Sequence, residues 1–311
     1  MEDAKLVVGT PRPAFRDRRE VHGVAWGLVA AMLTAGWWVI TRHGVTTAFD
    51  QYDVAALRFA TSGLLLAPVL WRNRRSIAEV PPLRLAVMVL CAGAPYSLVT
   101  GTGLQFASAG NGGTLVNGVM PLFAALLSAL VLRESVGPSR CLGLGIVVGG
   151  MLGLSGGAGL SVTSSPLFLL AGLMWAGFTV ALRGSGLGPL AAVAFVCVVS
   201  GAVYLPAYVL LADDPVALTA PLAELLPQAA YQGFLSAVVA VYCFAKAVML
   251  LGAARAAVFG ALVPVLASLL GAALLGEVPS SAEALSVATV ALGAALASGA
   301  VRLSVPLRAA S

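Results

Sequence analysis

The sequence predicts an all-α membrane protein whose ten transmembrane helices form two inverted repeats of five helices each. Three observations predict this class. First, 59% of the 311 residues are apolar and only 10% are charged, whereas about 25% of the residues in a soluble domain are charged. Second, the apolar residues form long blocks. Third, the second half of the chain repeats the pattern of the first half.

Ten apolar blocks are long enough for a membrane helix, which needs about 20 residues to cross about 30 Å of hydrocarbon. They do not show the alternating pattern of transmembrane strands. We place the ten spans near residues 22–40, 54–71, 85–105, 112–132, 141–158, 165–182, 189–211, 227–250, 256–275 and 284–301. The longest gap, residues 212–226, is too short to hold a soluble catalytic domain.

The basic residues predict the orientation, because cytoplasmic loops retain Lys and Arg. If the N-terminus is inside, 16 of the 18 basic residues lie on the cytoplasmic side and only Arg42 and Arg58 lie outside. Membrane topology thus accounts for the net charge of +5, and nucleic acid is not an expected partner. We predict an inner-membrane protein with both termini in the cytoplasm. Residues 1–21, predicted to be disordered, and residues 303–311 are the cytoplasmic tails.

An internal repeat divides the chain into residues 22–158 and residues 165–302. A shift of 143 residues places Pro121 on Pro264 and Glu134 on Glu277, and seven of the 14 positions from 121 to 134 are then identical. Because each repeat has an odd number of spans, the second must enter the membrane in the opposite sense. Inverted repeats are the architecture of many carriers that work by alternating access.

Five features together resemble the EamA branch of the drug/metabolite transporter superfamily. They are Leu57-Arg58-Phe59, the proline pair Pro121 and Pro264, the glutamate pair Glu134 and Glu277, Trp175-Ala176-Gly177-Phe178, and Gly252-Ala253-Ala254-Arg255. One departure is that the Trp-Gly often seen in the family's first span is here Ala35-Gly36, followed by Trp37 and Trp38. The resemblance implies a ten-helix carrier with a cavity between its halves. Such carriers move amino acids, other small metabolites or drugs, most often outward.

Polar and aromatic residues near the middle of the membrane are the candidates for substrate contact, because a polar side chain there is costly unless it faces a cavity or a partner. The candidates are Trp38, Tyr96, Asn117, Trp175, Tyr242, Phe259 and Arg58. Each has an alternative: the aromatic side chains could be packing residues, Asn117 could bond a neighbouring helix, and Arg58 could extend to the membrane surface. If Arg58 faces the cavity, it could bind a carboxylate.

Two prolines and two glutamates are candidates for conformational roles. Pro121 and Pro264 each remove a backbone hydrogen bond, so we expect kinks there that act in gating or shape the cavity wall. Glu134 and Glu277 follow their spans. They are either solvated helix ends paired with basic residues or parts of a gate.

Enzyme-like motifs in the sequence lack the partners that their chemistry needs. Residues 153–157 fit the G-x-S-x-G pattern of a serine hydrolase, but the only histidines, His22 and His43, lie at the two ends of the first span. Gly145, Gly149 and Gly153 recur every four residues, which predicts a helix face for close packing. The sequence therefore predicts no enzyme, no metal and no cofactor.

We predict a secondary-type transporter that exports amino acids or related small metabolites by alternating access. Multidrug efflux is the alternative. A membrane-embedded enzyme is a weaker alternative because no catalytic dyad is evident, and a channel is weaker because no continuous polar lining is evident. The expected partners are a small-molecule substrate and membrane lipid, with a homodimer left open.

Overall fold

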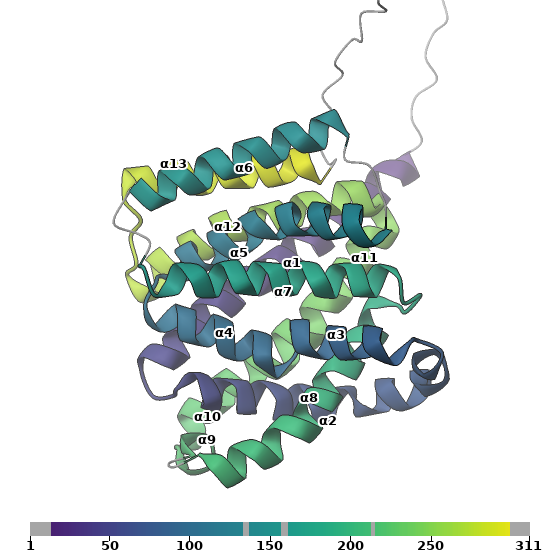
Figure 1. The fold of residues 1–311 in the computed structure, drawn as a ribbon, viewed down its shortest axis with the longest axis vertical. Helices are drawn as coiled ribbons and strands as arrows, with labels where there is room; N and C mark the ends of the chain where they lie inside the picture. The colour runs from purple at the N-terminus through teal and green to yellow at the C-terminus, as the bar shows by residue number, and fades with distance from the viewer. Residues whose placement is uncertain (1–13, 133–136, 157–160, 213–214, 299–311) are drawn as a thin grey trace, which may run out of the picture.

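The computed structural model describes residues 14–132, 137–156, 161–212 and 215–298, which form a bundle of helices (Figure 1). All regular structure in these residues is helical. Eight segments are long and apolar enough to cross a membrane, and two shorter apolar helices cover Arg140–Leu154 and Ser281–Ala297. The helical membrane class is thereby confirmed, while the count of ten spans stays a prediction.

The first half of the chain contains α1 (Ala14–Thr46), α2 (Gln51–Ala78), α3 (Pro82–Ala92), α4 (Ala94–Gln105), α5 (Ala109–Leu127), a π-helical segment η1 (Ser128–Leu132) and α6 (Pro138–Gly156). The second half contains α7 (Ser164–Arg183), α8 (Pro189–Leu211), α9 (Val216–Thr219), α10 (Leu222–Ala229), the π-helical segment η2 (Ala230–Val239), α11 (Ala240–Leu251), α12 (Ala253–Leu275) and α13 (Ser281–Ala297). α1 begins and α13 ends on the same side of the bundle (Figure 1).

Two segments differ from the sequence prediction. Residues 14–21 belong to α1 and are helical instead of disordered; the rest of that tail and the C-terminal tail lie outside the described residues. The third predicted span, residues 85–105, is broken at Gly93 into α3 and α4. Pro95 in the first turn of α4 lacks a backbone N–H, which favours the break. A Cβ at Gly93 would lie 2.2 Å from the Ser200 hydroxyl oxygen, so glycine is required there.

The same pairs of helices pack together when the two halves are exchanged. α1 packs against α11 and α12. Its sequence equivalent α7 packs against α3, α4 and α5, which are the equivalents of those elements. The pairs α2 with α8, α5 with α12 and α6 with α13 each join an element to its own equivalent. The repeat found in the sequence is therefore also a repeat of packing.

Glycines allow the backbones of α6 and α13 to come into direct contact. A Cβ at Gly143 would lie 2.4 Å from the Ala297 nitrogen, and one at Gly293 would lie 2.7 Å from the Val147 nitrogen. The predicted glycine face is only partly correct: Gly153 faces α13, but added Cβ atoms at Gly145 and Gly149 would meet open space. These glycines therefore belong to the outer face of α6.

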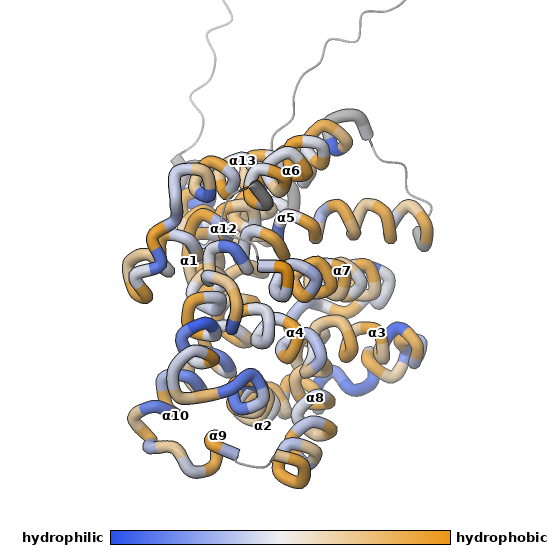
Figure 2. The backbone as a smooth tube through the Cα atoms, turned by 60° about the vertical axis from the view of Figure 1, so that its left-hand side comes forward, coloured by the Kyte–Doolittle hydropathy of each residue, from blue (hydrophilic) through white to orange (hydrophobic). Residues whose placement is uncertain are grey.

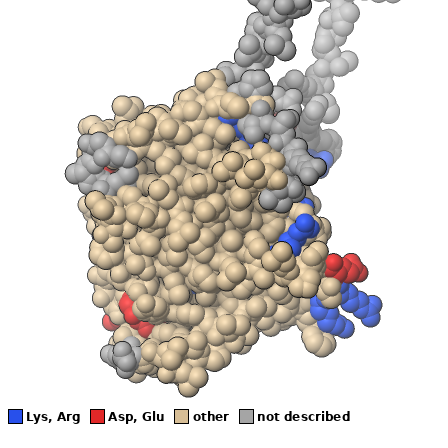
Figure 3. Space-filling model, viewed as in Figure 1, with Lys and Arg blue, Asp and Glu red and all other residues tan. Residues whose placement is uncertain are grey.

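The surface has the character expected for contact with lipid. Apolar residues line most of the helices, and hydrophilic segments lie mainly at helix ends, as beside the start of α3 (Figure 2). The face in Figure 3 is almost uncharged, and its visible Lys and Arg side chains gather at one side. Large apolar side chains such as Leu64 and Leu210 are about four-fifths exposed, at 79% and 80%. A soluble protein would not leave so many of them in water.

Candidate functional site

A chain of aromatic rings crosses the buried centre of the bundle, at contacts between the two halves. Trp37 and Trp38 of α1 are edge-on at 4.9 Å between ring centroids, and Trp37 stacks on Tyr96 of α4 at 6.2 Å. Tyr96 lies 5.1 Å from Trp175 of α7, and Trp38 lies 6.4 Å from Phe168 of α7. We call these five residues the aromatic cluster. Such geometries are the favourable ones for aromatic pairs.

The aromatic cluster contains three of the predicted substrate-contact residues. Trp38 and Tyr96 are buried, and Trp175 is half-buried at the edge of the same hydrophobic core. Phe259 of α12 is buried in this core as well, with its ring against Gly27 of α1. The structure thus brings these four residues into one region.

Arg58 of α2 points toward the aromatic cluster. Its guanidinium carbon lies 5.2 Å from the Trp37 ring centroid and 5.9 Å from that of Phe59. One terminal nitrogen donates a hydrogen bond to the Ser236 hydroxyl over 3.2 Å. The Nε atom is buried and has no hydrogen-bond partner. The Arg58 side chain therefore points into the bundle and does not extend to the membrane surface.

A buried glutamine of η2 fixes the first aromatic ring. Gln232 is fully buried; its side-chain oxygen accepts from the Trp37 indole over 2.7 Å, and its nitrogen donates to the Thr41 hydroxyl over 2.9 Å. Sequence analysis missed Gln232 and chose Trp38 over Trp37. The signal for Gln232 was present, because an amide inside an apolar span is costly unless it has partners.

Asn117 and the two prolines lie inside helices. The Asn117 side chain is half-buried, and its amide nitrogen donates to the Gly113 carbonyl of its own helix over 2.7 Å. Pro121 lies in α5 and Pro264 in α12. Because Pro121 has no N–H, the Asn117 carbonyl loses its usual helical partner. The kinks and their gating role stay predictions.

Tyr242 of α11 lies apart from the other candidates. Its side chain is 47% exposed and packs edge-on against Trp26 at 5.9 Å, with the Lys246 ammonium 5.4 Å from its ring. This arrangement is typical of aromatic residues that face lipid or the membrane surface. The structure therefore does not join Tyr242 to the aromatic cluster.

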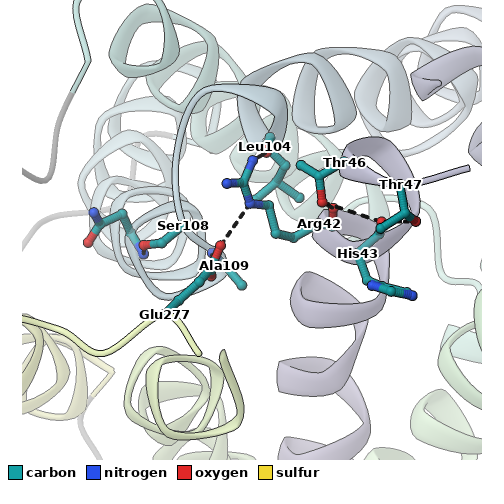
Figure 4. Close-up of polar contacts among 9 residues, drawn as sticks. Arg42, His43, Thr46, Thr47, Leu104, Ser108, Ala109 and Glu277 are labelled. Atoms are coloured by element: carbon teal, nitrogen blue, oxygen red, sulfur yellow. Dashed lines mark hydrogen bonds and ion pairs between the residues drawn. The ribbon is translucent and has the colours of Figure 1, made fainter. Parts of the chain in front are cut away.

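An ion pair between the two repeats lies at the end of α1 (Figure 4). Arg42 Nε donates to Glu277 Oε1 over 2.8 Å, and Glu277 Oε2 accepts from the backbone N–H of Ala109 over 2.9 Å. A terminal nitrogen of Arg42 also donates to the Leu104 carbonyl. Glu277 thus occupies the N-terminus of α5, where the helix dipole favours a negative charge. We call this arrangement the Arg42–Glu277 latch.

A polar cavity of about 290 Å³ adjoins the Arg42–Glu277 latch. Asn111 of α5 and Glu283 of α13 also line it, and the Asn111 amide donates to Glu283 over 3.0 Å. The sequence equivalent of Arg42 is Arg183, and that of Glu277 is Glu134, which lies outside the described residues. Glu277 is therefore paired with a basic residue, Arg42. A role in a gate stays a prediction.

A second cavity, of about 570 Å³, lies beside the start of α2. Asp50 and Asp53 form a reciprocal capping box there: Asp50 accepts from the Asp53 N–H, and Asp53 accepts from the Asp50 N–H over 3.0 Å. The buried Asp53 carboxylate also accepts from the Tyr208 hydroxyl and from the Ala217 N–H. Partial burial raises the pKa of Asp50. The two carboxylates therefore cap α2 and hold it to the adjacent segments.

In the part of the chain that the structure describes, no group of three or more His, Cys, Asp or Glu side chains is arranged to hold a metal ion.

Comparison with known proteins gives a family for this arrangement. The model of the EamA-like transporter family matches residues 21–156 and 163–299, one match on each repeat. No curated protein matches the chain. A solved structure titled "Crystal structure of protein" is 23% identical, with a TM-score of 0.59 over 88% of this chain and 96% of the other. At this identity the likeness concerns the fold alone. The two family matches, which together cover most of the chain, show that it belongs to the EamA-like transporter family and is a membrane transporter.

Proposed function

We propose that this transporter exports amino acids or related small metabolites across the inner membrane by alternating access. In this proposal α6 and α13 complete a set of ten spans, both termini are cytoplasmic, and the repeats are inverted. The exchangeable packing of the two halves supports alternating access, because two related halves give inward-open and outward-open states of similar energy. The distribution of Lys and Arg supports the orientation.

The aromatic cluster is the observation that carries the proposal. Its rings come from α1, α4 and α7, so they belong to both repeats. A substrate that binds these rings contacts both halves, so a relative movement of the halves changes its contacts. Aromatic faces bind the apolar parts of small molecules, while Arg58 supplies a charge beside them.

The Arg42–Glu277 latch supports the alternating-access part of the proposal. Arg42 belongs to the first repeat and Glu277 to the second, and the pair is only 22% and 17% exposed. A contact of this kind holds the halves together at one face. We propose that it breaks when that face opens, and that the polar cavity beside it becomes part of the exit path.

Multidrug efflux is the second candidate, and the aromatic cluster also suits flat apolar drugs. The charge that contacts the cluster is the positive charge of Arg58. It repels cationic drugs and attracts anions. The proposal therefore favours metabolites that carry an acidic group.

Untargeted mass spectrometry of the growth medium tests the proposal. Cells overexpress the wild type, Trp175→Ala or Tyr242→Ala, or carry an empty vector. Trp175 is part of the aromatic cluster, whereas Tyr242 is an exposed aromatic side chain outside it. We expect one or more amino acids or related metabolites to accumulate with the wild type and Tyr242→Ala, and at least about tenfold less with Trp175→Ala. Media that all match the empty vector, with the protein present in the membrane, overturn export.

A further inference from the structure

Arg58 has more hydrogen-bonding capacity than its surroundings use. A guanidinium carries five N–H donors and cannot be deprotonated inside a protein. Here Ser236 accepts one of them, and the buried Nε donates to nothing. A buried donor on a charged group is costly when it has no acceptor, and polar groups kept within membrane spans at such cost usually have a function.

The polar groups around Arg58 are held by hydrogen bonds to other partners, so few of them can accept from its guanidinium. Both ends of the Gln232 amide are used, by Trp37 and Thr41. The Ser236 hydroxyl donates to the backbone carbonyl of Gln232 over 2.7 Å. This bond orients the hydroxyl oxygen to accept from Arg58. The Trp37 ring stabilises the cation from one side. The guanidinium is therefore held in place while one edge has no acceptor.

The helix that supplies this environment is π-helical. Gln232 and Ser236 both lie in η2, residues Ala230–Val239. π-Helical segments occur frequently at functional sites, because they break the regular helical pattern and redirect side chains. η2 also approaches α2 closely, since a Cβ at Gly233 would lie 2.3 Å from the Thr61 Cβ. The irregular segment is therefore packed directly against the helix that carries Arg58.

The aromatic cluster extends from Arg58 toward the half-buried Trp175. The guanidinium lies over Trp37, Trp37 stacks on Tyr96, and Tyr96 contacts Trp175. A molecule with an anionic group at one end and an apolar or aromatic group at the other matches this sequence of surfaces. A carboxylate accepts two parallel hydrogen bonds from a guanidinium, which satisfies the free edge of Arg58.

We propose that Arg58 binds the carboxylate of the transported molecule, while the aromatic cluster binds its apolar side chain. The substrate class is small monocarboxylates with apolar or aromatic side chains, including α-amino acids. This inference rests on the proposed function and deepens it by naming the group that is recognised.

Binding to purified protein tests the site separately from transport. The readout is the quenching of tryptophan fluorescence, since Trp37 lies next to Arg58. The probes are the apolar and aromatic L-amino acids, the 2-keto acids derived from them, and the amides in which the carboxylate is replaced. The proteins are the wild type, Arg58→Lys, Arg58→Gln and Lys246→Gln. Lys246 is the matched control, because it is also a cation beside an aromatic ring but lies with the exposed Tyr242.

We expect at least one acid of the panel to bind the wild type and Lys246→Gln equally well. The affinity of the wild type for the amide, and that of Arg58→Gln for the acid, should each be at least about tenfold lower. Arg58→Lys should be intermediate, because an ammonium keeps the charge but not the two-bond geometry. Equal binding of acid and amide, an unchanged Arg58→Gln protein, or no binding of any acid overturns the inference. Elution of the variants as single symmetric peaks in detergent shows that they are folded.

The export experiment, with cells that overexpress Arg58→Gln added to it, distinguishes a failure of this inference from a failure of the proposed function. If carboxylates accumulate in the medium equally with the wild type and Arg58→Gln, export stands and Arg58 is not the anchor. If acid-selective binding depends on Arg58 but nothing accumulates, the anchor stands and export is wrong.

Discussion

Arg42 and Glu277 are 235 residues apart and join the two repeats through an ion pair of 2.8 Å. The second carboxylate oxygen of Glu277 accepts from the first turn of α5, so one side chain connects three segments. Arg255 of the second repeat forms another pair with Glu20, near the start of α1, at 3.0 Å, but their side chains are 56% and 43% exposed. The two pairs have similar geometry and different burial, which makes one a control for the other.

The Arg42–Glu277 latch should protect the start of α5. In Glu277→Gln the Ala109 N–H loses a charged acceptor, and such a hydrogen bond contributes about 1.5–3 kcal/mol. We expect hydrogen–deuterium exchange in residues 109–113 to become at least about tenfold faster. Arg255→Gln removes the exposed pair, worth about 0–1 kcal/mol, and should leave this exchange unchanged. Unchanged exchange in Glu277→Gln contradicts a holding role for the latch.

The contact between α6 and α13 should depend on Gly293. In Gly293→Ala the new methyl group meets backbone atoms of Val147 and Gly143 at 2.7 and 2.8 Å, so the helices must separate. We expect a loss of about 1–3 kcal/mol of stability and a lower melting temperature in detergent. Gly149→Ala adds the same methyl group in open space and should be neutral or stabilising. Equal melting temperatures for the two variants would show that the glycine contact is unimportant.

The Asp50 cap should make stability depend on pH. Because burial raises the pKa of Asp50 above its ordinary value of 3.8, the folded state binds its proton more tightly than the unfolded state. Stability contributed by this group is present below pH 3.8 and falls as the pH rises through the folded-state pKa. Asparagine keeps the cap without titrating. We expect melting curves of Asp50→Asn between pH 4 and 7 to lack this fall, and a pH profile identical to the wild type contradicts the assignment.

The inverted orientation predicts opposite accessibility for two loops. Val162, between α6 and α7, is 94% exposed, and Gly186 lies in the connection from α7 to α8. In a background without the four native cysteines, we expect an impermeant maleimide to label Val162→Cys from outside intact cells. Gly186→Cys should react only after the membrane is opened. The reverse labelling pattern, or labelling of both from outside, would show that the topology is wrong.

Much of the fold follows from patterns within single segments. Apolar length predicts the bounds of α7 and α8 to within one residue and those of α12 to within three. The repeat predicts which helices are equivalent. Glycine is required at the break because Ser200, more than 100 residues away, lies next to it, so within the segment only the adjacent Pro95 signals the break. The glycine face of α6 was partly misplaced because periodicity does not say which stripe meets a partner and which meets lipid.

Residues of the candidate site were predictable where a residue is unusual for a membrane span. Arg58, Tyr96 and Trp175 were identified because they are polar or aromatic in apolar segments. Trp37 and Trp38 differ by about 100° around the helix, and the sequence does not say which of these neighbours faces Arg58. The choice depends on Gln232, which approaches from η2 in the other half of the chain.

Efflux from proteoliposomes tests the central claim, transport through the site at the aromatic cluster, most directly. Purified wild type, Trp175→Ala and Tyr242→Ala are reconstituted at equal density and loaded with isotopically labelled apolar and aromatic amino acids and their 2-keto acids. We expect the wild type and Tyr242→Ala to release at least one of these compounds faster than protein-free liposomes, and Trp175→Ala to release it at least about tenfold more slowly than the wild type. Release no faster than from protein-free liposomes for every compound, or equal release by all three proteins, contradicts the claim.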